Sequence, residues 1–170
     1  DHTIELMHGG LDRSFIVHVP PAYDGLEPVS LVLNFHGLTS NAGQQVFFSE
    51  MNDTADKEGF VVVYPEGIQS SWNTGECCGG AQSMGLDDVG FARAVVEAVE
   101  GVVCVDPRRV YATGMSNSAR DHWCVMLLTR VISPLGTKCT VPSRPRSTVT
   151  RSVMRSTCPD TSPIFTTSLI

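Results

Sequence analysis

The sequence lacks a long apolar run, because charged or polar side chains interrupt every window of about 18 residues, the length that crosses a bilayer. It also has few basic residues, with 12 Lys and Arg against 18 Asp and Glu. Residues 1–119 cause this imbalance, since they contain 16 acids and only 5 bases. Phosphate recognition needs clustered positive charge. We therefore expect neither a membrane nor a nucleic-acid partner.

The last part of the sequence has little glycine and little acid. Residues 120–170 contain one glycine, two acids and seven bases, and residues 129–170 repeat with neither the period of a strand nor that of a helix. Such a pattern is typical of unstructured chain. We predict a folded but incomplete domain over 1–128 and a disordered or aberrant tail over 129–170. The abrupt change favours a shift of reading frame or splicing close after Ala119; a divergent C-terminal segment is the alternative.

No spacing of cysteine and histidine matches a zinc site, so we expect no metal. The six cysteines form an even set, which permits disulfides and favours an oxidising compartment. Their connectivity stays open, because spacing alone does not determine it. We therefore expect a secreted protein. The cysteines are Cys77, Cys78, Cys104, Cys124, Cys139 and Cys158.

Buried strands alternate with amphipathic helices along the first part of the chain. This alternation predicts a parallel sheet covered by helices, and hence the α/β fold class. The predicted elements are a half-exposed strand at 13–19, a buried strand at 30–35, a helix at 43–58, a buried strand at 60–64, a helix from Asp87 to about 103, and a strand at 110–113.

The last of these strands runs directly into Gly114-Met115-Ser116-Asn117-Ser118. A Gly-x-Ser-x-small sequence between a buried strand and a helix holds its serine on a sharp, strained turn. A chance Gly-x-Ser in a loop is the alternative. Two other features, His36-Gly37 and a Gly/Ser/Asn-rich loop at 66–84, also follow predicted strands. Because ligands of parallel sheets bind beyond the carboxyl ends of the strands, the three features together favour one site at that edge.

Six short segments stand in a specific order between residues 8 and 119. They are Gly10-Leu11-Asp12-Arg13-Ser14, Asn34-Phe35-His36-Gly37, Tyr64-Pro65-Glu66-Gly67, Trp72-Asn73 before Cys77-Cys78-Gly79, Asp87-Asp88-Val89-Gly90-Phe91, and Val105 to Asn117. In this order and spacing they resemble the family of polyhydroxybutyrate depolymerases and feruloyl or acetylxylan esterases, a branch of the α/β-hydrolases. The resemblance implies an α/β-hydrolase-like parallel sheet with flanking helices, which this chain truncates after the nucleophile elbow.

The resemblance also implies roles for individual residues. Ser116 would attack an ester carbonyl, and the backbone N–H groups of Asn117 and Leu38 would hold the oxyanion. His36 would support the oxyanion loop and, with Trp72, belong to the substrate-binding residues. For Trp72 we expect either stacking on an aromatic or sugar part of the substrate or packing within its own loop. No cofactor is expected.

The catalytic acid and histidine of an α/β-hydrolase follow its serine in the chain. After Ser116 this sequence offers only Asp121, His122 and Asp160. Asp121 and His122 lie on the helix that leaves the elbow, so His122 is not expected to reach the serine hydroxyl. Asp87 and Asp88 are expected to cap a helix. We therefore expect a serine esterase for polyester or aryl/acetyl ester substrates by lineage, with weak or absent activity in this chain itself.

Three alternatives to this interpretation stay open. The chain could be a non-catalytic binder of carbohydrate or polyester that uses Trp72 and the 66–84 loop. It could be a fragment without function, because missing strands would leave the edge beside the elbow strand unpaired. It could also work in an assembly in which another chain supplies the acid and the histidine.

Overall fold

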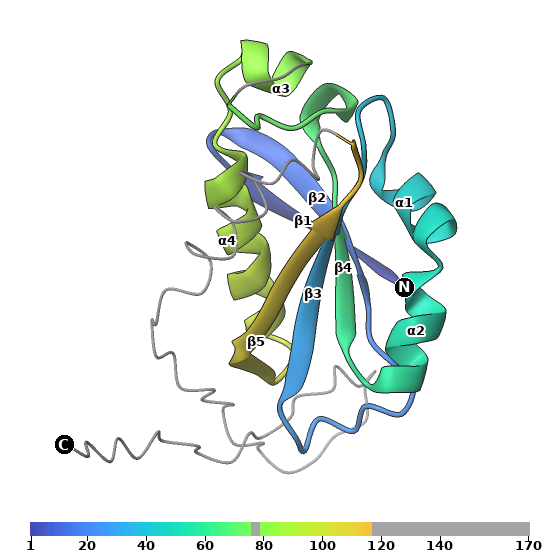
Figure 1. Cartoon of the computed structure of the whole chain (residues 1–170). Coiled ribbons are helices and arrows are strands. Elements are labelled where there is room, and N and C mark those ends of the chain that lie inside the picture. Colours follow the sequence, from blue (N-terminus) through green and yellow to red (C-terminus); the bar gives the residue numbers. More distant parts are fainter. Residues whose placement is uncertain (76–78, 117–170) are drawn as a thin grey trace, which may run out of the picture.

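The computed structural model describes residues 1–75 and 79–116. Within these residues the chain forms one five-stranded sheet with the strand order β1-β2-β4-β3-β5 (Figure 1). The α/β class predicted from the sequence is confirmed, because helices and strands alternate from residue 29 onward. The strands are β1 (His2–His8), β2 (Leu11–His18), β3 (Val29–Phe35), β4 (Val61–Pro65) and β5 (Val105–Gly114).

The sheet is mixed, which corrects the expectation of a parallel sheet. β3 runs parallel to both β4 and β5, as the alternation predicted. β1 and β2, however, form an antiparallel hairpin, and β2 pairs antiparallel with β4. The hairpin turns at Gly9 and Gly10, which both have positive φ, as a two-residue hairpin turn of this kind requires. This Gly-Gly pair between two alternating segments is the sequence signal that predicts β1.

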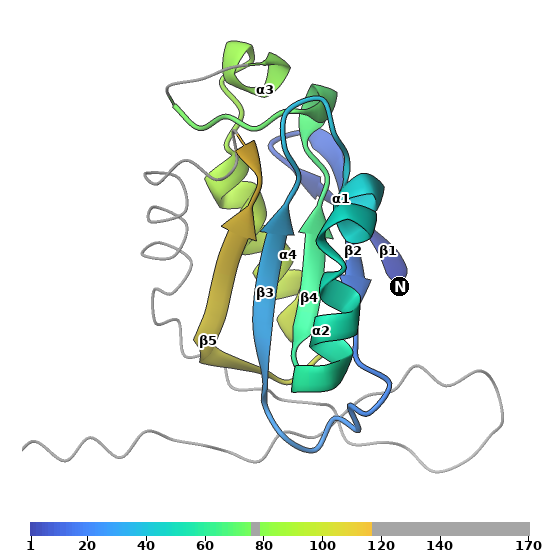
Figure 2. The same ribbon diagram turned by 45° about the vertical axis from the view of Figure 1, so that its right-hand side comes forward.

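Helices cover both faces of the sheet (Figures 1 and 2). One face carries α4, and the other carries α1 and α2, which follow β3 in the chain. This arrangement buries the central strands on both sides, so their continuous apolar sequences are explained. The helices are α1 (Ala42–Ser49), α2 (Met51–Glu58) and α4 (Asp88–Glu100).

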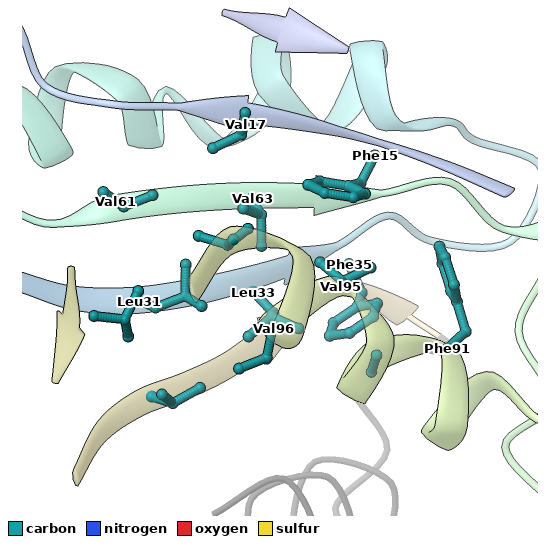
Figure 3. Packing of buried hydrophobic residues seen from close by; sticks show 14 of the residues in the cluster. Phe15, Val17, Leu31, Leu33, Phe35, Val61, Val63, Phe91, Val95 and Val96 are labelled. Carbon is teal, nitrogen blue, oxygen red and sulfur yellow. The ribbon is translucent and has the colours of Figure 1, made fainter. Parts of the chain in front are cut away.

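β4 shows how the two faces are filled, because all five of its residues are buried. Val61 and Val63 point to one face and pack in the cluster that contains Val95 of α4 (Figure 3). Val62 points to the opposite face and packs with Ala55 of α2. Successive residues of a strand point to opposite sides, so one short apolar segment contributes to both cores. The sheet is thereby packed between two layers of helices.

The single helix predicted at 43–58 is in fact two helices. Glu50, with φ of 48°, ends α1 and begins α2. The sequence repeats Phe47, Met51 and Ala55 every four residues, which predicts that they share one buried helix face, and the change of direction at Glu50 breaks this repeat. Ala55 is fully buried as predicted, whereas Phe47 is 76% exposed. Gly59 ends α2 in the left-handed conformation, as its position in the sequence predicted.

The segment 66–84 is not an uninterrupted loop, because it contains the 3-10 helix η1 (Ile68–Ser70) and the short helix α3 (Gly80–Ser83). The predicted boundary between a domain at 1–128 and a tail at 129–170 lies outside the described residues. Among the residues that the structure describes, no helix has the length and apolar character of a membrane span.

Candidate active site

The site begins where two parallel strands end side by side. Phe35 at the end of β3 pairs with Gly114 at the end of β5, and the next residue, Met115, donates its N–H to the Phe35 carbonyl at 3.1 Å. Because the two strands are parallel neighbours in register, the loops that follow them leave the same edge of the sheet. Gly37 and Ser116 are 79 residues apart in the chain. They are nevertheless adjacent in space.

Ser116 stands on a strained turn. Its φ is 58°, in the left-handed region that side-chain-bearing residues rarely adopt, and its surface is exposed. Gly37 presses against it, since a Cβ atom on Gly37 would lie 3.3 Å from Ser116 Cβ and 3.3 Å from the Met115 carbonyl oxygen. The backbone geometry is the one that the Gly-x-Ser pattern predicts, and the close approach explains why a glycine follows His36.

The loop after Gly37 is a tight turn held at two points. Ser40 donates its N–H to the Gly37 carbonyl at 3.2 Å, and Thr39 donates its N–H to the Ser70 carbonyl at 2.9 Å. Between them, the N–H of Leu38 has no acceptor among residues 1–75 and 79–116. Leu38 directly follows Gly37, the residue that contacts Ser116, and its role as an oxyanion donor stays a prediction. Asn117, the other expected oxyanion donor, lies outside the described residues.

His36 is buried and bonded through both ring nitrogens. Its Nδ1 lies 2.8 Å from the Gly37 carbonyl oxygen, and its Nε2 lies 2.9 Å from the Gly67 nitrogen. A carbonyl only accepts and a backbone N–H only donates, so the ring is the neutral tautomer with its proton on Nδ1. The Glu66 carboxylate, 3.7 Å from Nε2, faces a nitrogen without a proton and forms no ion pair.

The charge state of His36 agrees with its surroundings. Burial lowers the pKa of His36, and the hydrogen bond to Gly37 and the nearby carboxylates oppose that effect only in part. The side chain is 0% exposed. It therefore has no surface to offer a substrate, which corrects its expected place among the substrate-binding residues. What the ring does is join the Gly37 turn to the loop after β4.

Trp72 is buried as well, with 0% of its surface exposed. Its Nε1–H donates to the His36 carbonyl at 2.8 Å, and its ring meets Phe35 edge to face with centroids 5.1 Å apart. An indole without exposed surface does not stack on a substrate. The expected substrate contact is therefore corrected, and packing within its own loop does not describe Trp72 either, because the indole packs against Phe35 and His36 at the end of β3.

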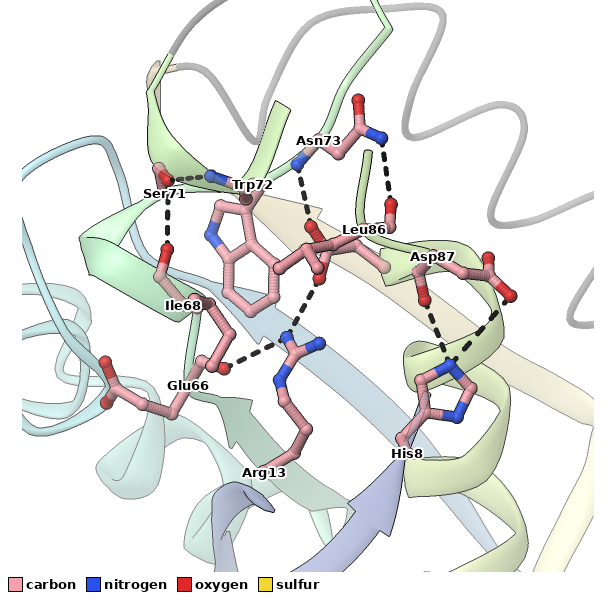
Figure 4. A network of polar contacts seen from close by, with 12 residues as sticks. His8, Arg13, Glu66, Ile68, Ser71, Trp72, Asn73, Leu86 and Asp87 are labelled. Carbon is pink, nitrogen blue, oxygen red and sulfur yellow. Dashed lines mark hydrogen bonds and ion pairs between the residues drawn. The ribbon is translucent and has the colours of Figure 1, made fainter. Parts of the chain in front are cut away.

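Asp87 and Asp88 differ although they are neighbours at the start of α4. Asp87 caps the helix, since its side chain accepts the Gly90 N–H at 2.8 Å. Asp88 instead pairs with Arg13 at 2.8 Å, with side-chain exposures of 0% and 2% (Figure 4). Burial raises the pKa of Asp88, and the Asn73 N–H and the Arg13 guanidinium oppose that effect.

Arg13 was not among the residues expected to serve the site. A signal for it exists in the sequence, because Arg13 shares the inward face of β2 with Phe15 and Val17. A charged residue on a buried strand face needs a partner of opposite charge. Asp88 is that partner, although 75 residues separate the two.

Residues with strained backbone conformations are concentrated at this edge of the sheet. Five non-glycine residues in the described part of the chain have positive φ, and four of them lie in loops that follow the parallel strands. Each parallel strand contributes, because Thr39 follows β3, Gln69 and Ser70 follow β4, and Ser116 follows β5. Strained residues of this kind persist where the surrounding structure holds them in place, and they cluster at functional sites.

The remaining groups expected for catalysis lie outside the described residues. These are Asp121, His122 and Asp160, the possible triad acids and base that follow Ser116 in the sequence. Within residues 1–75 and 79–116, no group of three or more His, Cys, Asp or Glu side chains is arranged to hold a metal ion. The described site thus consists of a strained serine, the Gly37 turn that contacts it and the buried contacts behind them.

Two curated esterases are similar in sequence to this chain. Feruloyl esterase B of Piromyces equi is 33% identical over 108 residues, which cover 61% of this chain and 19% of that protein. The putative esterase NocK of Nocardia uniformis subsp. tsuyamanensis is 34% identical over 115 residues, which cover 66% of this chain and 33% of that protein. The chain therefore spans a third or less of these curated relatives.

A solved structure shows the same fold. The S-formylglutathione hydrolase from Agrobacterium tumefaciens superposes with a TM-score of 0.53 at 17% identity, over 75% of this chain and 52% of that one. The sequence model of the family described as "Esterase PHB depolymerase" matches residues 13–141, a range that reaches beyond Ala119 and covers well over half of the chain. The protein therefore belongs to the Esterase PHB depolymerase family and has the α/β-hydrolase fold.

Proposed function

We propose that this chain provides the nucleophile and the oxyanion loop of a serine carboxylic-ester hydrolase. The observation that supports it most is Ser116, exposed and left-handed at the carboxyl end of β5, with Gly37 packed against its Cβ. Leu38 is the next residue after Gly37, and we propose that its N–H faces the position that the oxyanion would occupy. A nucleophile and an oxyanion donor must lie about 3 Å from a common reacting atom, and this adjacency permits that.

The proposed reaction is acyl transfer in two steps. Ser116 Oγ attacks the ester carbonyl, and the N–H groups of Leu38 and Asn117 stabilise the charge that develops on the carbonyl oxygen. The alcohol leaves, and water then hydrolyses the acyl-enzyme. Loss of one such backbone or side-chain donor typically lowers the rate by about 10²–10³. No organic cofactor or metal has a role in these steps.

The proposed substrates are polyesters or the aryl and acetyl esters of plant cell walls. The family description and the name of the Piromyces equi relative support this class. We also propose that the protein is secreted, with neither a membrane nor a nucleic-acid partner. Disulfide-bonded Cys104 supports an oxidising compartment; every other cysteine lies outside the described residues.

For the 170 residues by themselves we propose weak or absent activity. A serine without its general base is a poor nucleophile, and removal of the base in a serine triad costs several orders of magnitude in rate. His122 is the only histidine after Ser116 in the sequence, and it comes directly after the elbow. We keep the proposal that residues 129–170 are a disordered or aberrant tail, which translation of the other reading frames beyond the Ala119 codon would test.

The two rival functions differ in their support. A non-catalytic binder that uses Trp72 loses its principal contact, because the indole is buried. A non-functional fragment stays a rival, since in the described part of the chain β5 pairs only with β3. A cooperative thermal transition of a soluble monomer would count against that rival.

The deciding experiment compares hydrolysis of p-nitrophenyl butyrate by the chain, by Ser116→Ala and by Ser83→Ala. Ser83 is an exposed serine on α3, so its loss is a matched control. We expect slow hydrolysis that disappears in Ser116→Ala and persists in Ser83→Ala. Equal hydrolysis by Ser116→Ala would refute the nucleophile, and turnover at the rate of an intact triad enzyme would refute the proposed weakness of this chain.

A further inference from the structure

Arg13 and Asp88 form a buried ion pair for which the proposed reaction has no use. The Arg13 Nη2 atom lies 2.8 Å from Asp88 Oδ1, and the guanidinium lies over the Phe91 ring with Cζ 3.7 Å from the ring centroid. Removing two charges from water is costly, so a buried pair is weak evidence for a role in stability. The hydrogen bonds from these two side chains to neighbouring loops indicate a different role.

The Asp88 carboxylate holds the loop that contains Trp72. Its Oδ2 accepts the backbone N–H of Asn73 at 2.7 Å, and Asn73 Nδ2 donates to the Leu86 carbonyl at 2.8 Å. Trp72, the residue before Asn73, donates its indole N–H to the His36 carbonyl at 2.8 Å. One series of contacts therefore leads from Asp88 through Asn73 and Trp72 to the main chain of His36, and Figure 4 shows the hydrogen bond between Asn73 and Leu86.

The Arg13 guanidinium holds the loop after β4 in the same way. Its Nη2 donates to the Glu66 carbonyl at 3.3 Å. Gly67, the residue after Glu66, donates its N–H to His36 Nε2, and His36 Nδ1–H donates to the Gly37 carbonyl. Gly67 must be a glycine for this contact, because a Cβ there would lie 2.5 Å from the Ser71 carbonyl oxygen.

Both series of contacts end on His36, one on its main chain and the other on its ring. The residue that follows, Gly37, packs against Ser116 Cβ, and Leu38 comes next. We propose that Arg13 and Asp88 are positioning residues of the oxyanion loop, which place the Leu38 N–H relative to Ser116 by holding His36 from two sides. The effect of the ion pair on catalysis rests on the proposed ester hydrolysis. Its effect on the position of the loop rests only on the contacts described above.

A positioning role for the ion pair differs from a purely structural role in one testable way. If the pair only fills space in the core, two apolar residues of similar size should replace it without loss, as buried ion pairs elsewhere tolerate. If it positions His36, the same replacement leaves the fold intact but loosens the contacts that end on His36. The double variant Arg13→Met with Asp88→Leu separates the two roles.

The experiment measures hydrogen exchange by NMR without any substrate. The reporters are the Trp72 indole N–H and the amides of Gly67 and Thr39, each compared with the amide of Val63 in the buried strand β4. We expect the ratio of reporter to Val63 exchange to rise at least tenfold in the double variant. Asp106→Asn, which breaks an ion pair at the opposite end of β5, is the matched control and should leave the ratio unchanged.

An unchanged ratio in the double variant would overturn the proposal, as would an equal rise in Asp106→Asn. If the double variant does not fold, Arg13→Lys replaces it, because lysine keeps the charge but loses the planar guanidinium that lies over Phe91 and holds Nη2 against Asp88 and Glu66. We expect at least a threefold rise of the ratio in Arg13→Lys, and an unchanged ratio would again overturn the proposal.

Hydrolysis provides the second readout. In the double variant, Ser116-dependent hydrolysis of p-nitrophenyl butyrate should lose at least tenfold in kcat with little change in KM, because the oxyanion forms only after substrate has bound. A loss confined to KM would contradict the assigned role. Absent Ser116-dependent hydrolysis is an outcome that the proposed lack of a general base allows, and the exchange ratio then decides by itself whether the pair positions the loop.

Discussion

The two ends of the parallel strands are built differently. At the carboxyl end, polar side chains such as His36 and Asp88 are fully buried, each has hydrogen-bond partners, and the loops contain strained backbone. At the opposite end, Asp106 pairs with Arg108 and Arg109, whose side chains are 80% and 46% exposed.

This difference shows what each end requires. Exposed ion pairs contribute little to stability, because water and salt screen them and long side chains must be ordered to form them. Buried polar contacts are costly to leave unpaired, so they hold their partners in one arrangement. The carboxyl end therefore has loops that are held by buried contacts, while the arginines of the ion pairs at the opposite end are exposed. Four predictions test this contrast, from the largest expected effect to the smallest.

The first prediction concerns Asp88→Ala. Removing one partner of a buried ion pair leaves the other charge uncompensated, which typically costs about 3–5 kcal/mol. We expect the free energy of unfolding to fall by about that amount, measured by urea denaturation. A loss as small as that of Asp106→Asn in the same assay would remove the contrast between the two ends.

The second prediction compares two glycines. A Cβ on Gly67 would lie 2.5 Å from the Ser71 carbonyl oxygen, whereas one on Gly43 of α1 would meet only Asn41 Oδ1 at 3.5 Å. We expect Gly67→Ala to lower the free energy of unfolding by about 1–3 kcal/mol, as overpacking does. Gly43→Ala should instead stabilise by about 0.5–1 kcal/mol, because alanine favours helix. Equal effects in denaturant titrations would contradict the assigned crowding at Gly67.

The third prediction concerns the pH dependence of stability. Burial lowers the pKa of His36 below its ordinary value of 6.5, so the unfolded chain binds the proton more tightly than the folded one. The stability that neutral His36 contributes is present above pH 6.5 and is lost as pH falls through the lowered pKa, by at most about 1.4 kcal/mol per pH unit. Unfolding free energies of the chain and of His36→Asn should therefore converge below pH 6.5. A difference independent of pH would contradict this result.

The fourth prediction concerns the opposite end of the sheet. Hydrogen bonds from Arg108 lower the pKa of Asp106 to about 2, against an ordinary value of 3.8. Its contribution to stability is therefore present above pH 3.8 and is lost as pH falls toward 2. We expect Asp106→Asn to remove this acid dependence and to change the thermal midpoint at pH 7 only slightly. A large drop at pH 7, comparable to that of Asp88→Ala, would show that both ends are equally critical.

Much of the fold followed from local sequence. The apolar segments at 30–35 and 60–64 predicted two central strands, and Asp87-Asp88 predicted the start of α4, because these signals act between near neighbours in the chain. The strained turn at Ser116 was predictable for the same reason, since Gly-x-Ser after a strand describes a local geometry.

Other features depended on contacts between distant residues. The helix predicted at 43–58 breaks at Glu50, and Phe47 is exposed, because packing against the sheet outweighs a four-residue repeat. Trp72 in a loop sequence resembles a residue at a binding surface, and its burial arises from Phe35 and His36, which lie far away in the chain.

The sequence by itself determined the α/β class, the family and the position of the strained serine, because short segments and their order in the chain specify each of these features. Only the tertiary structure decided that the hairpin β1–β2 joins the sheet antiparallel, that Arg13 pairs with Asp88, and that His36 is neutral and held from two sides. These features require groups as many as 75 residues apart to meet in the buried interior. No local pattern specifies such a meeting, because burial and partner choice are properties of the packed chain.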